Sequence, residues 1–98
     1  MEAKEFVSQW LRAVYENNEP EIYHALTKRT VFFSIEKKEE VSLEELLKEI
    51  HQFQSAKEKM MVSRVCVKIC LLQEADELQL FFEIEKNRFK RIEFCHHC

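Results

Sequence analysis

The fold is decided by three alternating stretches in the C-terminal third, which read VSRVCVKICLL (62–72), ELQLFFEIEK (77–86) and FKRIEFCHH (89–97). The first stretch places Val67, Ile69 and Leu71 at odd positions, whereas the second places apolar side chains at even positions from Leu78 to Ile84. Alternation with a period of two is typical of a strand with one buried face. The three stretches therefore predict three consecutive antiparallel strands.

The parity of the buried positions predicts the register of these strands, because a slip of one residue moves every side chain to the other face. The first two stretches bury positions of opposite parity, so a four-residue loop over 73–76 would pair Val67 with Phe82. The second and third stretches bury the same parity. We therefore expect a three-residue loop over 86–88, which would place Phe82 opposite Ile92.

The outer face of this predicted sheet mixes thiols and aromatic rings with charges. The register sets Glu83 opposite Arg91, and such cross-strand pairs contribute about 0.2–1 kcal/mol each. A patch of apolar groups among charges indicates a protein interface, although scattered exposed apolar residues are the alternative interpretation. We predict a homodimer, or contact with another protein, through this face. The predicted interface residues are Cys66, Lys68, Cys70, Phe81, Glu83, Phe89, Arg91, Glu93 and Cys95.

The first two thirds of the chain predict helices that cover the sheet. Apolar residues recur at helical spacing over 3–17, Pro20 suits the first turn of a shorter second helix, and residues 30–35 suit a short strand. Ser42 with Glu45 forms a capping box at the start of a third helix. We predict one α+β domain over residues 1–98, with the order α-α-β-α-β-β-β. Its N-terminal helices pack on one face of a curved C-terminal antiparallel sheet, and residues 54–59 form a polar connection.

Composition excludes several classes of function. The chain has 98 residues, one Pro and no Gly, so it has no glycine-built phosphate loop or dinucleotide fingerprint. With a net charge of −3 and no basic stripe, we expect no nucleic-acid partner. No apolar run suits a signal peptide or a membrane span. We expect a cytoplasmic protein with reduced cysteines and no cofactor.

Aromatic and amphipathic groups near the expected junction of helices and sheet are candidates for lining a pocket. In the predicted register, His96 falls on the buried face at the end of the sheet. A pocket at this junction would take a small apolar ligand, although such residues on a helix stripe are more often ordinary core. The candidate lining residues are Trp10, Tyr15, Tyr23, Phe82, Phe94 and His96.

Acid–base and metal chemistry find little support in the residues. The single Asp, Asp76, lies in a turn, and no inward Glu has the burial or charge partner that shifts a catalytic pKa. The chain ends in Cys95, His96, His97 and Cys98, but adjacent strand residues point to opposite faces. A structural zinc site needs four converging ligands. We therefore predict no catalytic residue and no metal site.

Two segments resemble the nuclear-transport-factor-2-like superfamily, also called SnoaL-like or cystatin-like. Phe6-Val7-x-x-Trp10-Leu11-x-Ala13-Val14 resembles its first helix. The segment Asn87-Arg88-Phe89-Lys90-Arg91-Ile92-Glu93-Phe94 resembles its final hairpin. The resemblance implies a cone-shaped pocket between helices and curved sheet, and dimers through the sheet face. Isomerases and dehydratases of this superfamily carry inward Asp and His groups. The chain is shorter than usual for the family, and we expect it to lack a strand or two.

These observations favour a small, non-catalytic binding or interaction module that dimerises through the outer sheet face. One alternative is an isomerase- or hydrolase-type enzyme with a cone pocket, which would use His96 or His24 with a tyrosine. Another is a regulatory or phage-type inhibitor that binds a larger protein through its acidic helices.

Overall fold

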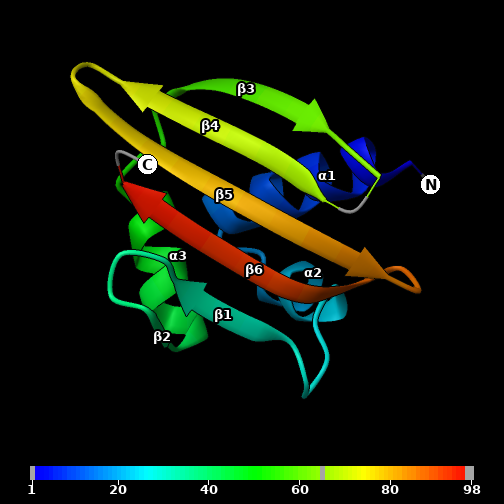
Figure 1. The fold of residues 1–98 in the computed structure, drawn as a ribbon. Coiled ribbons are helices and arrows are strands. Elements are labelled where there is room, and N and C mark those ends of the chain that lie inside the picture. The colour runs from blue at the N-terminus through cyan, green and yellow to red at the C-terminus, as the bar shows by residue number, and fades with distance from the viewer. Residues whose placement is uncertain (1, 65, 97–98) are drawn as a thin grey trace.

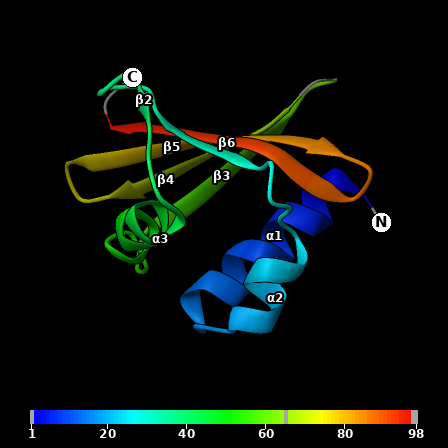
Figure 2. The same cartoon turned by 90° about the horizontal axis from the view of Figure 1, so that it is seen from below.

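Three helices lie on one face of a six-stranded sheet in the computed structural model, which describes residues 2–64 and 66–96 (Figure 1). The sheet order is β2-β1-β6-β5-β4-β3. The sheet is bent, with the helices gathered on one side (Figure 2). The predicted α+β architecture is confirmed. The elements are α1 Ala3–Tyr15, α2 Glu19–His24, β1 Val31–Ser34, β2 Glu39–Glu40, α3 Leu43–His51, β3 Lys57–Val62, β4 Val67–Gln73, β5 Asp76–Glu85 and β6 Arg88–His96.

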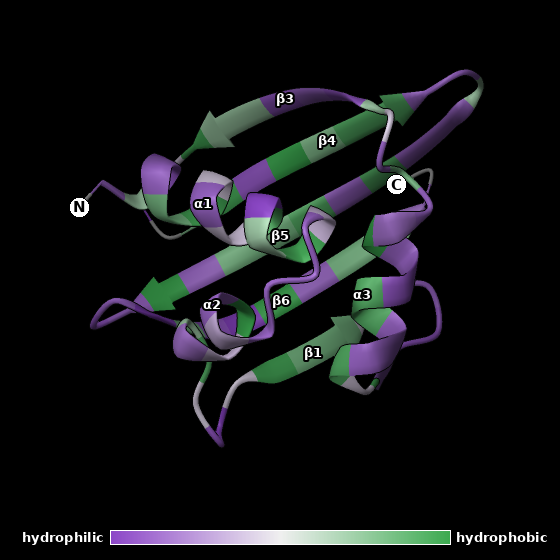
Figure 3. Cartoon of the chain, turned by 180° about the vertical axis from the view of Figure 1, so that it is seen from behind, coloured by the Kyte–Doolittle hydropathy of each residue, from purple (hydrophilic) through white to green (hydrophobic). Residues whose placement is uncertain are grey.

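The core lies between the helices and the inner face of the sheet. Hydrophobic segments of β4, β5 and β6 run beneath the helices (Figure 3). Val67 pairs with Phe82, and Phe82 pairs with Ile92, as the alternation predicts. The predicted cap of α3 is also confirmed on the Ser42 side, because its hydroxyl accepts a hydrogen bond of 3.2 Å from the Glu45 backbone N–H.

The described chain has two more strands than the sequence pattern predicts. Residues 57–62, expected as part of a connection and the start of the next strand, form β3 along the edge of the sheet and pair with β4. Lys57, Glu58 and Lys59 are all charged, so the start of this strand lacks the apolar alternation by which a strand is predicted from sequence. Charged side chains are common on strands at sheet edges. β1 pairs antiparallel with the short strand β2 but parallel with β6, so the sheet is mixed rather than wholly antiparallel.

The turn between β5 and β6 differs from the predicted three-residue loop. Lys86 and Asn87 alone form it, with φ angles of 52° and 62°, and Glu85 pairs directly with Arg88. Two successive residues with positive φ are typical of the tight hairpin turn whose twist matches that of the flanking strands.

A β-bulge three residues beyond this turn restores the predicted register. Ile84 pairs with Phe89, but the preceding Glu83 pairs with Arg91, so Lys90 is an extra residue on β6. Because one residue is inserted, the side chains of β6 between the bulge and the turn lie on the opposite face from the one that uninterrupted alternation predicts. Phe89 therefore lies on the inner face, and its predicted place in the outer interface is wrong.

The Phe89 ring is fully buried and holds the hairpin against the helices. Its centroid lies 4.9 Å from that of Phe6, 5.3 Å from that of Trp10 and 5.2 Å from that of Phe82. Its backbone N–H donates a hydrogen bond of 2.8 Å to the carbonyl of Ala25, just beyond α2. One residue therefore links α1, α2 and the final hairpin.

Replacing each phenylalanine of the hairpin tests this register. Phe89→Ala is expected to lower the free energy of unfolding by about 3–5 kcal/mol, the usual cost of removing a buried ring. Phe81→Ala, on the outer face, should cost no more than about 1.5 kcal/mol, as expected for a partly exposed apolar side chain. Urea unfolding at low protein concentration measures both. Equal losses would contradict the inward position of Phe89.

Tyr15, the last residue of α1, makes stability sensitive to alkaline pH. Burial, and secondarily the nearby Glu58 carboxylate of β3, raise the pKa of Tyr15 to about 12 from its ordinary value of 10.0. Because the unfolded chain then loses this proton first, the free energy of unfolding falls as pH rises from 10 towards 12.

The variant Tyr15→Phe has no phenol to ionise at this position in either state. Its free energy of unfolding should therefore decline less than that of the wild type over the same alkaline range. Denaturant unfolding at a series of pH values measures the two slopes, and parallel slopes would show that Tyr15 is not responsible.

Candidate functional site

The outer face of the sheet, opposite the helices, holds eight of the nine residues predicted for the interface. Lys68 pairs with Phe81, and Phe81 pairs with Glu93, which places the three in one row across β4, β5 and β6. Glu83 and Arg91 are paired, as predicted. Cys66, Cys70 and Cys95 share this face, whereas Phe89 belongs to the core.

A shallow groove of about 210 Å³ crosses this face and is here called the outer groove. The Nζ atom of Lys68 lies 5.5 Å from the centroid of the Phe81 ring. The guanidinium carbon of Arg91 lies 4.8 Å from the centroid of the Phe33 ring. A cation is attracted to the face of an aromatic ring, and this attraction helps to hold both side chains in place. The lining residues are Ile35, Cys66, Phe81, Glu83, Arg91 and Glu93.

The cysteines contribute less surface than the sequence pattern suggests. Cys70 is 8% exposed and Cys95 is completely buried, although both belong to the outer face. Cys66 and Cys70 have free thiols, whereas Cys95 is disulfide-bonded. The expectation of reduced cysteines is therefore wrong for Cys95. Met61 and Leu72 are the more exposed apolar side chains of this face, at 44% and 46%, whereas Phe81 is partly exposed.

The residues predicted to line a ligand pocket do not surround one cavity. Trp10, Phe82 and Phe94 are buried in the core, with at most 4% of each exposed. Tyr15 is partly buried against the same core, whereas Tyr23 is 55% exposed on α2. The sequence analysis favoured ordinary core for the aromatic residues of this set, and the ring of Phe89, which it placed on the opposite face, packs against Trp10 and Phe82.

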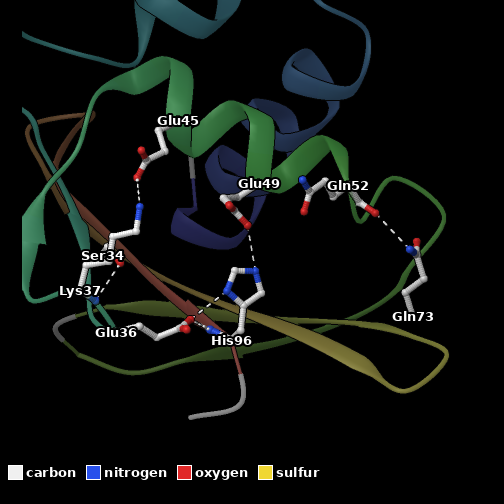
Figure 4. Close-up of polar contacts among 8 residues, drawn as sticks. All are labelled: Ser34, Glu36, Lys37, Glu45, Glu49, Gln52, Gln73 and His96. Carbon is white, nitrogen blue, oxygen red and sulfur yellow. Dashed lines mark hydrogen bonds and ion pairs between the residues drawn. The ribbon is translucent and has the colours of Figure 1, made fainter.

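His96, the sixth predicted pocket residue, lies between two carboxylates at the end of β6 (Figure 4). Its Nδ1 atom is 2.8 Å from Glu36 Oε1, and its Nε2 atom is 2.8 Å from Glu49 Oε2. The backbone N–H of His96 also donates to the Glu36 carboxylate. This histidine clasp, composed of Glu36, Glu49 and His96, joins the β1–β2 hairpin, α3 and β6.

The clasp is better suited to holding these elements together than to catalysis. Both ring nitrogens of His96 lie 2.8 Å from a carboxylate oxygen, so both have a partner within the protein. A general base needs a nitrogen within hydrogen-bond reach of its substrate. Sequence reasoning missed Glu36 and Glu49 because they lie far from His96 in the chain and resemble ordinary solvated residues.

A groove of about 460 Å³ lies on the helix side, between α1, α2 and the β5–β6 turn. It contains His24, the other histidine of the enzymatic alternative, and Trp10 of the predicted pocket. Both Glu21 and Arg88 lie at its surface. The full lining is Phe6, Gln9, Trp10, Glu21, His24, Ala25, Asn87 and Arg88.

The described residues, 2–64 and 66–96, offer neither a metal-binding cluster nor a membrane-spanning helix. Within these ranges, no group of three or more His, Cys, Asp or Glu residues is arranged to hold a metal ion. Of the C-terminal motif, His97 and Cys98 lie outside the described residues. None of the helices in these ranges has the length and apolar character that a membrane crossing requires.

A double-mutant cycle tests the histidine clasp. His96→Ala is expected to lower the free energy of unfolding by about 0.5–1.5 kcal/mol, because it removes the imidazole from both carboxylates while the backbone N–H of residue 96 still donates to Glu36. Glu36→Gln should be less destabilising in the His96→Ala background than in the wild type, because the imidazole contact is then already lost. Glu39→Gln, at an exposed position in the neighbouring strand β2, is the control. Additive effects of the two clasp substitutions in denaturant unfolding would contradict the coupling.

Comparison with known proteins finds similarity at the level of structure. No family model matches the sequence, and no curated protein matches it. An NTF2-like protein of unknown function from Cytophaga hutchinsonii superposes with a TM-score of 0.66 at 14% identity, over 98% of this chain and 90% of that one.

Two further solved structures show how widely this architecture is used. An LEH-like epoxide hydrolase from M. tuberculosis has a TM-score of 0.59 at 13% identity, over 94% of this chain and 80% of that one. A de novo designed NTF2 fold protein has a TM-score of 0.61 at 17% identity, over 97% of this chain and 86% of that one. A hydrolase and a designed protein share the architecture, so it does not specify an activity. The chain therefore has the NTF2-like fold expected from its first helix and final hairpin.

Proposed function

We propose that the protein is a non-catalytic binding module that pairs with a second copy of itself through the outer face of its sheet. The observation that carries this proposal is the position of the helices, which lie together on the inner face (Figure 2). They leave the outer groove open, with the partly exposed rings of Phe33 and Phe81 beside it. Apolar groups ordered at an open face are typical of an interface.

The packed interior supports the non-catalytic part of the proposal. Enzyme pockets are usually concave sites with a few convergent polar groups. At the corresponding place in this fold, Trp10, Phe82 and Phe89 pack ring against ring. His96, the histidine expected there, is engaged by Glu36 and Glu49. A small apolar ligand would need this interior to open.

The charges of the outer face favour a second copy as the partner. Two cations, Lys68 and Arg91, lie among two anions, Glu83 and Glu93, so the face is close to neutral. In a two-fold dimer each patch meets its own copy in the opposite direction. Such a face can place its cations against the anions of the second copy, which favours specific pairing. A different protein partner would need a matching pattern of its own.

A cytoplasmic location completes the proposal. The free thiols of Cys66 and Cys70 support it, because reducing compartments keep thiols unpaired, whereas the disulfide at Cys95 is the observation against it.

Sedimentation equilibrium tests the proposed dimer. The wild type is expected to dimerise at micromolar concentration. Phe81→Asp should weaken the association by about tenfold or more, because it places a charge at the centre of an apolar contact. Tyr23→Asp is the matched control, since it changes an exposed ring on the helix side. Circular dichroism should show both variants folded.

Two outcomes would contradict the proposal. One is a wild type that stays monomeric at high micromolar concentration, with or without reductant. The other is equal weakening by Phe81→Asp and Tyr23→Asp, which would place the contact elsewhere.

A further inference from the structure

Cations gather at one corner of this acidic molecule. The loop between α2 and β1 comes beside the start of β6, because the Thr30 hydroxyl donates a hydrogen bond of 2.6 Å to the Phe89 carbonyl. Residues 27–31 carry a net charge of +2 and residues 85–91 carry +3, so together they carry +5 in a chain whose net charge is −3. The cations are Lys28, Arg29, Lys86, Arg88, Lys90 and Arg91, and Glu85 is the acid.

A groove of about 390 Å³ lies where these two segments meet and is here called the corner groove. Four of the cations line it, together with a threonine hydroxyl and a small apolar wall. Cations confined to one groove repel one another, and a bound anion relieves that repulsion. The lining residues are Thr27, Arg29, Val31, Glu85, Arg88, Phe89, Lys90 and Arg91.

The loop side of the corner groove is held by its own hydrogen bonds. The backbone N–H of Thr27 donates to Thr30 Oγ1 at 2.9 Å, and the backbone N–H of Arg29 donates to Thr27 Oγ1 at 3.1 Å. Thr30 is in turn bonded to the carbonyl of Phe89, whose own N–H is bonded to Ala25. The backbone that positions Arg29 is therefore fixed relative to β6, and a site needs such preorganisation.

The charges of the groove are only weakly compensated within the described protein. Lys90 lies 3.9 Å from the Glu85 carboxylate, and both side chains are more than 60% exposed, so the pair contributes little. Arg88 donates to the neighbouring Asn87 carbonyl. Arg91, by contrast, is ordered by Glu93 and Phe33 on the outer face.

We propose that the corner groove binds a small phosphate-bearing molecule. Arg29 and Arg88 would donate to the phosphate oxygens, and Lys90 would add charge at the exposed rim. Guanidinium groups match phosphate oxygens in pairs, and a phosphate dianion offsets more of the excess charge than a single carboxylate. The groove also leaves room for the organic part of the ligand beside Val31.

The corner groove and the outer groove share one lining residue, Arg91. Arg29, Arg88 and Lys90 do not line the outer groove, so substitutions at Arg29 and Arg88 should leave the proposed dimer intact. A nucleic acid is a less suitable ligand, because it requires a longer basic track than one corner of an acidic chain provides.

Isothermal titration with inorganic pyrophosphate and with ribose 5-phosphate, in low-salt buffer, tests the inference. Both probes should bind the wild type saturably at micromolar to millimolar concentration. The double variant Arg29→Gln with Arg88→Gln should bind about tenfold or more weakly, because it loses two charge-assisted donors. The control replaces two exposed cations near the opposite edge of the sheet, Lys59→Gln with Arg64→Gln, and should stay within about twofold of the wild type.

Circular dichroism and sedimentation equilibrium complete the experiment, and the double variant should remain folded and dimerise as the wild type does. Three outcomes would overturn the inference: absence of saturable binding at millimolar probe, equal weakening in the control variant, or much tighter binding of a single-stranded oligonucleotide that Arg29→Gln with Arg88→Gln abolishes. The last result would assign the groove to nucleic acid.

Discussion

The structure depends on one extra residue in its last strand. Side chains alternate between the two faces of a strand, so the insertion of Lys90 opposite a regular β5 reverses the facing of the hairpin end. Phe89 consequently enters the core, where it meets α1 and lies bonded to the end of α2. The same bulge leaves Glu83 opposite Arg91 on the outer face, so a single irregularity determines the composition of both faces.

The two faces then have different roles. On the inner face, packed rings occupy the space that a cone-shaped pocket would need, and the histidine clasp ties α3 and the β1–β2 hairpin to the far end of β6. On the outer face, the partly exposed rings lie under cations. The bulge also brings Lys90 and Arg91 together at the corner beside the Arg29 loop. The proposed contacts therefore lie on the surface of the molecule rather than in its interior.

Much of the architecture could be predicted from local pattern. Alternation specified the pairing of Val67 with Phe82, and Ser42 marked the start of α3, because both signals act over a few residues. The parity of the buried positions could not show where the extra residue of the last hairpin lies. A three-residue turn and a two-residue turn followed by a bulge give the same pairing between Glu83 and Arg91 and onward. The charged edge strand β3 lacked the alternation that reveals buried strands. The contact of His96 with Glu36 depends on the parallel pairing of β1 with β6, because Glu36 follows β1. No local sequence pattern predicts that pairing.

The position of the Phe89 ring in solution tests this account most directly. Nuclear Overhauser measurements on a sample with selectively labelled aromatic rings would detect the protons near it. An inward Phe89 ring should show strong effects to the rings of Phe6 and Trp10. Effects from Phe89 to the side chains of Phe81 and Arg91 instead would place the ring on the outer face and contradict the account.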